Sequence, residues 1–316
     1  MSTSCDAYLG KNPARYGRDI VRGLGIKQPP IDENLVADFL GYEIKAVGVE
    51  ETLERPGLHK ILQIACAHLF KKLNLIIVNR DMRRGRKRMS IFHEFGHDCI
   101  PWHRGFDFAC SESAIEPVFH HLIEKEAFAC GSEIMMPSHL FIPDVFSLPL
   151  GIDAIKELTS RYDASLEATA IRYAHTNPNI CAIVMIEPAE NQRPKAIVQD
   201  HTPPGQLLLP IRVPLRPLAV EDDKRDLLKV KYFVRSHRFP KYIAPGTGIE
   251  EDNPVFEAWA TGRPVQEQIP ASVFGSSAKW SYNAECVPLG QSGMVLVLLW
   301  LPDRHLKLDF KNGVIL

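Results

Sequence analysis

The stretch RKRMSIFHEFGHDCIPWH, residues 86–103, contains an HExxH sequence and is expected to begin as a helix. On a helix, side chains four positions apart lie on one face, so the imidazoles of His93 and His97 can reach a single metal ion. Glu94 lies beside the first histidine, where its carboxylate can accept a proton from a water molecule at that ion. The stretch therefore predicts a zinc site of the hydrolytic kind, with Glu94 as the general base.

The surroundings of the motif favour a metal site over the alternative, which is two histidines on a helix surface. That alternative has to be weighed because so short a motif also occurs by chance. Here the helix expected over residues 86–100 directly follows a buried strand expected over residues 73–79, and it ends before Pro101. Gly96, inside the motif, would let another element approach the helix closely because it has no side chain.

A catalytic zinc site needs a third protein ligand and an open fourth position. One route is His103, which stands where an HExxHxxGxxH pattern has its third histidine, although Ile100 replaces the glycine of that pattern. The other route is a glutamate on a second helix, expected over residues 117–136, which contains Glu124 and Glu126. The candidates near the motif are Asp98, His103, Asp107, Glu112, Glu116, His120, His121, Glu124 and Glu126. Residue types and spacing alone leave both routes open.

At this point the chain resembles the ImmA/IrrE family of bacterial and phage-related regulatory metallopeptidases. The family pattern has a basic and aromatic lead-in to HE-[LF]-GH, then a helix that reads E-x-E-A-x-x-F-A-x-x-L-L-M-P, and this chain has EKEAFACGSEIMMP at residues 124–137. The resemblance implies that Glu124 is the third metal ligand, with Glu126 as the fallback. It also implies a gluzincin-like zinc metalloendopeptidase that cleaves a regulatory protein, a transcriptional repressor of XRE type, in a stress or mobile-element response.

Phe128 and Cys130 depart from the family pattern. Phe128 stands four positions after Glu124, where the family has a polar residue, and Cys130 stands where it has phenylalanine. The first change removes a polar side chain that would support a zinc-bound histidine, so we expect weaker support of the metal ligands. Mn²⁺ or Fe²⁺ can also occupy a site of two histidines and a glutamate. The alternative to a peptidase is a non-catalytic, metal-containing regulator that binds protein, DNA or a small ligand.

Composition is typical of a globular protein. Of the 316 residues, 45% are hydrophobic and 24% are charged, and the mean hydropathy is −0.10. The net charge of −1 argues against binding nucleic acid by broad electrostatic attraction. The seven cysteines are scattered without a CxxC pair, so we expect reduced thiols and a metal site built from histidine and carboxylate. No apolar run is long enough to span a bilayer, and a cytoplasmic protein without membrane contact is expected.

Three segments are expected along the chain, and together they predict an α+β protein. Residues 1–145 form a mainly helical, zincin-like zinc metallopeptidase domain with a small sheet. Residues 146–176 hold a helix pair, 153–162 and 165–175, that resembles a helix-turn-helix. Residues 177–316 form a strand-rich α+β domain. Longer relatives of IrrE type carry a GAF-like sensor domain in this place, which implies that the last segment binds an unknown small ligand.

Two places in the chain could contact DNA. In residues 80–88, six of nine positions are Lys or Arg. We interpret this stretch as a solvated loop that leads into the next helix, with contact to nucleic acid as the alternative. The second place is the helix pair in residues 153–175. Two short helices that only pack against one another are at least as common in proteins as a DNA-binding helix-turn-helix. DNA binding through this pair is therefore the lesser expectation.

Overall fold

The computed structural model describes residues 12–52, 57, 59, 66–103, 117–189 and 227–301; of residues 117–121 and 291 only the backbone is described. The chain divides into two units, Met1–Asn179 and Ile180–Leu316. The helix pair in residues 146–176, expected as a segment of its own, lies within the first unit, where its two helices contact one another. Each unit is described by itself below.

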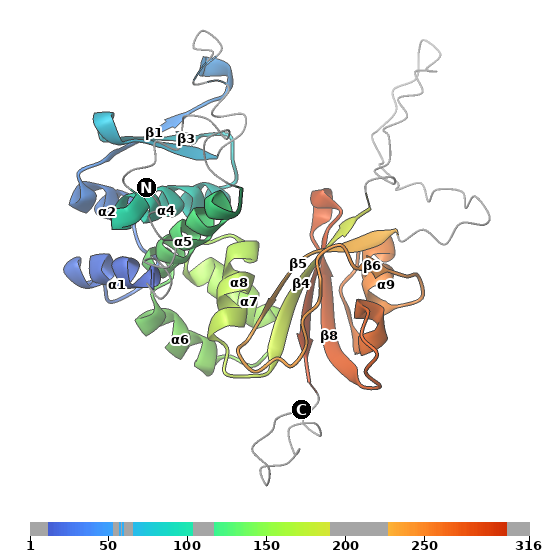
Figure 1. Ribbon diagram of the computed structural model, residues 1–316. Helices are drawn as coiled ribbons and strands as arrows, with labels where there is room; N and C mark the ends of the chain where they lie inside the picture. Colours follow the sequence, from blue (N-terminus) through green and yellow to red (C-terminus); the bar gives the residue numbers. More distant parts are fainter. Residues whose placement is uncertain are drawn as a thin grey trace, which may run out of the picture. The chain divides into compact units, whose positions relative to one another are not determined.

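The first unit joins helices to a small sheet, as expected (Figure 1). Its helices are α1 (Ala14–Gly23), α2 (Glu33–Leu40), α4 (Arg84–Cys99), α5 (Pro117–Met135), α6 (Ser138–Ser147), α7 (Ile152–Arg161) and α8 (Leu166–Thr176). Its strands are β1 (Glu43–Val47), β2 (Ala67–Phe70) and β3 (Leu75–Asn79), in the order β1-β3-β2. Strand β3 pairs in parallel with β1 and antiparallel with β2, so β2 lies at an edge of the sheet.

Strand β3 and helix α4 form the core that holds the HExxH motif. Ile76 and Val78 of β3 are buried, as the apolar run predicts. Helix α4 contacts β2, β3 and α5 (Figure 1). Its Phe92 and Phe95 side chains are fully buried. The motif therefore lies on a helix that is held between the sheet and a second helix.

Helices α4 and α5 approach one another to backbone contact through two glycines. A Cβ on Gly96 would overlap the carbonyl oxygen of Ala127, and a Cβ on Gly131 would overlap that of Phe92. The expectation that Gly96 allows close approach of another element is therefore confirmed. Because the two helices lie so close, the side chain of Glu124 on α5 comes near His93 and His97 on α4.

Local signals explain where several of these elements begin and end. Gly41 ends α2 with a φ of 79°, a left-handed conformation that glycine adopts without strain. The hydroxyl of Ser165 accepts a 3.1 Å hydrogen bond from the backbone N–H of Ala168 and caps α8. The stretch 58–69 has apolar residues at helical spacing but also residues that favour strands, and from Ala67 onward it is strand. Of its earlier residues, only His59 and Cys66 are among the described residues.

In its described residues, the second unit is an antiparallel sheet covered by one α-helix. Its elements are β4 (Cys181–Pro188), β5 (Leu228–Arg235), β6 (Gly248–Ile249), α9 (Pro254–Thr261), β7 (Val265–Pro270), β8 (Ser281–Pro288) and β9 (Val295–Trp300). The strand order is β6-β5-β4-β9-β8-β7, so the first and last strands of the unit pair at the centre of the sheet. Helix α9 packs on β7, β8 and β9. The expected strand-rich α+β unit is confirmed; a small ligand for it stays a prediction.

Sequence patterns located the buried strands of this unit and missed its exposed ones. Short apolar runs at 180–186, 229–234, 284–289 and 293–301 correspond to β4, β5, β8 and β9, while a similar run at 306–310 lies outside the described residues. Strand β7 was missed because Ile269 is its one fully buried residue, which leaves no alternating pattern. Helix α9 was missed although Asn253 caps its start and Gly262 its end, because eight residues are too few for a clear period.

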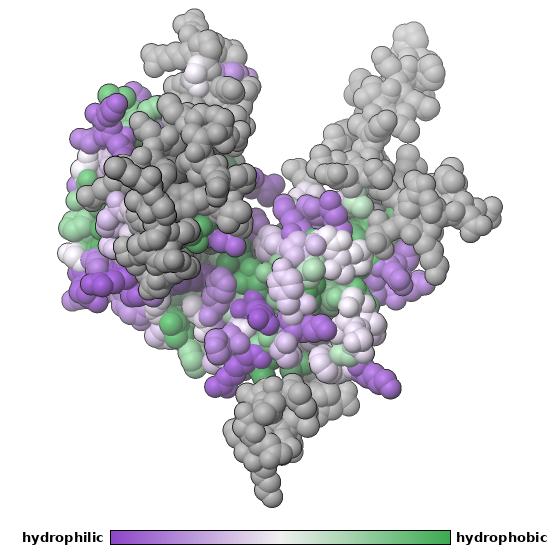
Figure 2. Space-filling view, viewed as in Figure 1, coloured by the Kyte–Doolittle hydropathy of each residue, from purple (hydrophilic) through white to green (hydrophobic). Residues whose placement is uncertain are grey.

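The surface of both units mixes hydrophilic and hydrophobic residues on the face drawn in Figure 2. Six large hydrophobic side chains are notably exposed: Leu35, Phe39, Leu73, Leu122, Phe146 and Tyr242. Among the described residues, we find no helix with both the length and the apolar character needed to cross a membrane.

Candidate metal centre

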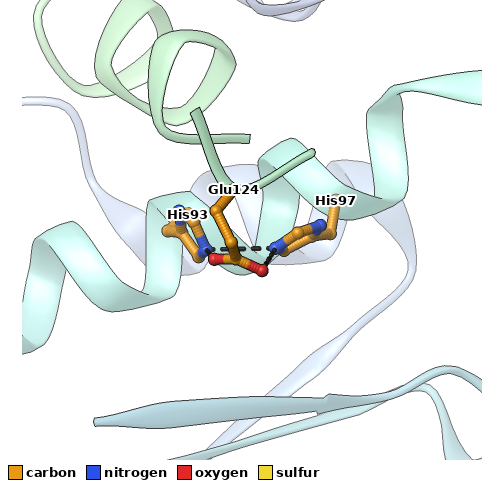
Figure 3. Close-up of side chains that lie close together, drawn as sticks. All are labelled: His93, His97 and Glu124. Carbon is orange, nitrogen blue, oxygen red and sulfur yellow. Dashed lines mark hydrogen bonds and ion pairs between the residues drawn. The ribbon is translucent and has the colours of Figure 1, made fainter. Parts of the chain in front are cut away.

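Three side chains from two helices converge on one point (Figure 3). His93 and His97 extend from α4, one turn apart, and Glu124 extends from α5. The Nε2 atoms of the two histidines lie 3.0 Å apart, and Oε2 of Glu124 lies 3.0 Å from Nε2 of His93. Oε1 of Glu124 lies 3.5 Å from Nε2 of His97. Within the described part of the chain, these residues form the one group of three side chains that could hold a metal ion.

The spacing of these atoms fits a tetrahedral metal ion. Zinc binds imidazole nitrogen and carboxylate oxygen at about 2.0–2.1 Å, so two such ligands at the tetrahedral angle lie about 3.3 Å apart. The observed separations of 3.0 and 3.5 Å bracket that value. His93, His97 and Glu124 could therefore hold a metal ion with small movements of their side chains.

The surroundings of these three side chains shift their pKa values. Burial lowers the pKa of His97 to about 4, so its imidazole is neutral near pH 7, as a metal ligand must be. Burial alone would raise the pKa of Glu124, but its interactions with His93 and His97 outweigh burial and lower it, so the carboxylate is ionised. Burial also opposes the charged form of His93, yet Glu124 and Glu94 outweigh it and raise the pKa of that imidazole.

Glu94 lies between the motif helix and the edge of the sheet. Its Oε2 accepts a 3.1 Å hydrogen bond from the backbone N–H of Leu69 in β2. Burial raises the pKa of Glu94 to about 7, although the charge of His93 and the bond from Leu69 act in the opposite direction. Glu94 is absent from the group of ligand atoms. The carboxylate is therefore held beside the candidate metal position rather than in it.

His103 lies behind His97, and not at the candidate metal position. Its Nδ1 is 3.2 Å from Nδ1 of His97, the ring nitrogen that points away from Glu124. The backbone after α4 becomes extended at Ile100, and Pro101 begins a short 3-10 turn that returns His103 to the protein interior. Of the two routes to a third ligand, the structure brings Glu124 to the histidine pair and places His103 outside the group.

Glu126, the fallback ligand, faces a different set of partners. Its Oε2 accepts hydrogen bonds from Nε1 of Trp102 at 2.6 Å and pairs with Nε2 of His103 at 3.0 Å. Residues two positions apart leave a helix in directions about 200° apart, so Glu124 and Glu126 cannot point at the same ion. His103 and Glu126, both candidate ligands by residue type and spacing, thus pair with one another, a contact that the sequence does not reveal.

Of the remaining candidates, the structure describes the side chain of Asp98 alone. Asp98 pairs with Nζ of Lys71 at 3.8 Å. The other candidates are outside the residues, or the side chains, that the structure describes: Asp107, Glu112, Glu116, His120 and His121. Phe128 is partly buried, and the weaker support of the metal ligands expected from it stays a prediction.

The basic stretch 80–88 is not a uniformly solvated surface, and that interpretation is wrong for Arg88, which is 2% exposed. Arg88 donates to Oε2 of Glu33 at 2.7 Å and to the carbonyl oxygens of Tyr162 and Asp163 at 2.9 and 2.7 Å. It also donates to the carbonyl oxygen of Ile31. These bonds attach the start of α4 to the turn between α7 and α8. The turn between α7 and α8 is therefore packed against α4, and DNA binding by this helix pair stays a prediction.

Comparisons with known proteins agree with this geometry. Residues 66–173 match the peptidase M78 family model, described as an IrrE N-terminal-like domain. No curated protein matches the chain. Among solved structures, a "Mycobacterium tuberculosis transcriptional regulator" is similar, with a TM-score of 0.55 and 14% sequence identity over 98% of this chain and 95% of that chain, which shows a common fold. Residues 66–173 therefore carry an IrrE N-terminal-like domain of the peptidase M78 kind, the family to which the motif and the second helix pointed.

Proposed function

We propose that this chain is a zinc-dependent endopeptidase that cleaves a regulatory protein, a transcriptional repressor of XRE type. The observation that carries the proposal is the convergence of His93, His97 and Glu124 inside a peptidase M78 domain, with Glu94 beside them. The choice of a repressor as the substrate rests on the resemblance to the ImmA/IrrE family.

The donor set supports zinc as the metal. Two imidazole nitrogens and one carboxylate oxygen are the ligands of hydrolytic zinc sites, which keep a fourth position open. A zinc ion held there supplies Lewis acidity, which polarises a carbonyl oxygen and lowers the pKa of water. Mn²⁺ and Fe²⁺ suit the same three ligands, so the metal of the purified protein has to be measured.

Glu94 is placed to hold and move the proton of the reaction. The bond from Leu69 fixes one carboxylate oxygen, Oε2, against β2. A pKa of about 7 allows the carboxylate to take a proton from the attacking water and return it to the leaving amine near neutral pH. Because a glutamine in this place has the same shape and no basic oxygen, Glu94→Gln separates catalysis from metal binding.

The edge position of β2 supports a peptide as the substrate. One side of β2 pairs with β3, and the N–H of Leu69 on its other side is bonded to Glu94. An extended peptide can add to such an edge through main-chain hydrogen bonds. Its backbone would then pass beside Glu94 and the three candidate ligands.

The test compares wild type with Glu94→Gln in a search for new protein N-termini. Each purified chain is loaded with one equivalent of zinc and incubated with a lysate of cells that contain XRE-type repressors, and the N-termini are labelled and identified. We expect a new N-terminus within a repressor that appears with wild type and not with Glu94→Gln. If both proteins hold zinc and neither produces a new N-terminus, the peptidase proposal fails and the non-catalytic regulator replaces it.

A further inference from the structure

A set of hydrogen bonds extends from His97, on the side away from Glu124, to a buried carboxylate. Nδ1 of His97 lies 3.2 Å from Nδ1 of His103, and Nε2 of His103 lies 3.0 Å from Oε2 of Glu126. The same oxygen accepts a 2.6 Å hydrogen bond from Nε1 of Trp102. His103 is 0% exposed and Glu126 is 8% exposed, so a polar group left without its partner here would be costly.

The donors and acceptors in this set are consistent with one arrangement of protons. Oε2 of Glu126 is the acceptor that faces Nε2 of His103, so this ring nitrogen carries the proton between them. Nδ1 of a neutral His103 is then an acceptor, and Nδ1 of His97 donates to it. With its proton on Nδ1, His97 presents the lone pair of Nε2 toward His93 and Glu124. A metal-binding histidine needs this tautomer.

We propose that His103 and Glu126 are positioning residues that hold His97 in the tautomer and orientation that bind the metal. The inference rests on the proposed zinc site and deepens it. Trp102 contributes by fixing Glu126, since it donates to the oxygen that also faces His103.

His103 and Glu126 come from different parts of the chain. His103 follows α4 through the turn at Pro101, and Glu126 lies on α5, two positions after Glu124. Helix α5 thus supplies a candidate metal ligand, Glu124, and also Glu126, which supports a second candidate ligand, His97, through His103. This support is independent of position 128, where Phe128 replaces the polar residue of the family pattern.

The test measures the affinity of the full chain for Zn²⁺ by competition with a chromophoric chelator. Loss of an outer hydrogen-bond partner lowers metal affinity by about 10–100-fold at such sites, and we expect a loss in this range for His103→Phe. Glu126→Gln keeps the size of the side chain and removes its charge, so we expect a loss at the lower end, about 10-fold. In His103→Asn an amide oxygen stands near the place of Nδ1, and it should bind zinc more tightly than His103→Phe.

A double variant separates positioning from packing. Because Glu126 acts on His97 through His103, the variant with both His103→Phe and Glu126→Gln should bind zinc as weakly as His103→Phe alone. Glu133→Gln is the matched control, since Glu133 is a buried carboxylate on the same helix that pairs with Arg172 at 2.6 Å. It should lower thermal stability and leave zinc affinity at the wild-type value.

Wild-type zinc affinity in both His103→Phe and Glu126→Gln would overturn the positioning role. So would a double variant whose fold-loss of zinc affinity is the product of the two single losses. An equal loss in Glu133→Gln would overturn it as well, because affinity would then report general stability. If His103→Phe fails to fold, the comparison of Glu126→Gln, His103→Asn and Glu133→Gln decides. Zinc affinity is measured without a substrate, so a chain that cleaves no repressor can still show the positioning effect.

Discussion

Gly96 of α4 faces Ala127 of α5 so closely that a Cβ on the glycine would overlap the carbonyl oxygen of the alanine. This contact sets the separation of the helices that carry the histidine pair and Glu124. We expect Gly96→Ala to push the helices apart, to lower the free energy of unfolding by about 1–3 kcal/mol and to weaken metal binding. Denaturant unfolding and the zinc content of the purified variant check both effects.

Gly23→Ala is the control for that substitution. A Cβ on Gly23 would meet only the ring of Phe39, at 3.0 Å, and this ring is 51% exposed and can move. We expect little change in stability and none in zinc content. Equal effects of the two substitutions would contradict the importance of the contact between α4 and α5.

The ligand set is tested by metal stoichiometry under identical metal supply. We expect about one zinc ion per chain in wild type, none in Glu124→Gln, and about one in Glu126→Gln when zinc is in excess, because Glu126 faces His103 rather than the ion. Elemental analysis after gel filtration measures all three. Loss of zinc in Glu126→Gln alone would reverse the assignment of the third ligand.

Glu94→Gln should retain zinc and lose peptidase activity. The side chain is outside the group of ligand atoms, so stoichiometry should match that of wild type. Removal of a general base costs about 10²–10⁴-fold in rate. Cleavage of a repressor substrate measures the loss, and a variant that cleaves at the wild-type rate would exclude Glu94 as the base.

Arg88 and Arg84 make a matched pair, since both bond to Asp163. Arg88 is 2% exposed and donates to backbone carbonyl oxygens as well as to Glu33, whereas the side chain of Arg84 is 71% exposed. Arg88→Met breaks a buried ion pair and should lower the free energy of unfolding by about 3–5 kcal/mol. Arg84→Met should cost about 0–1 kcal/mol. Denaturant unfolding of both variants checks the difference.

Two thiols should make the second unit sensitive to alkali. Burial raises the pKa of Cys181 and of Cys286 to about 12. Unfolded thiols ionise near pH 9, so between pH 9 and pH 12 the unfolded state has lost protons that the folded state keeps, and stability falls as pH rises. At pH 10.5 the loss is about 2 kcal/mol per thiol. Thermal unfolding from pH 8 to 10.5 should show a steeper decline in wild type than in a variant with alanine at both positions.

The local structure around the motif could be predicted from the sequence. The apolar run in β3, the proline after α4 and the four-residue spacing of His93 and His97 depend on neighbours in the chain, and helices and strands obey such short-range periods. The glycine stop of α2 and the serine cap of α8 are local in the same sense. These elements were placed within a few residues of their observed bounds.

What only the tertiary structure decided is which distant side chains meet. Spacing could not choose between Glu124 and His103, because the choice depends on the crossing of α4 and α5 at Gly96 and on the turn at Pro101. Burial of Arg88 in the basic stretch likewise depends on carbonyl groups of the turn between α7 and α8, more than 70 residues away. The sequence by itself determined the helix that presents His93 and His97. The packing of α4 and α5 determined which side chains these histidines meet, because contacts across a core depend on proximity in space rather than on position in the chain.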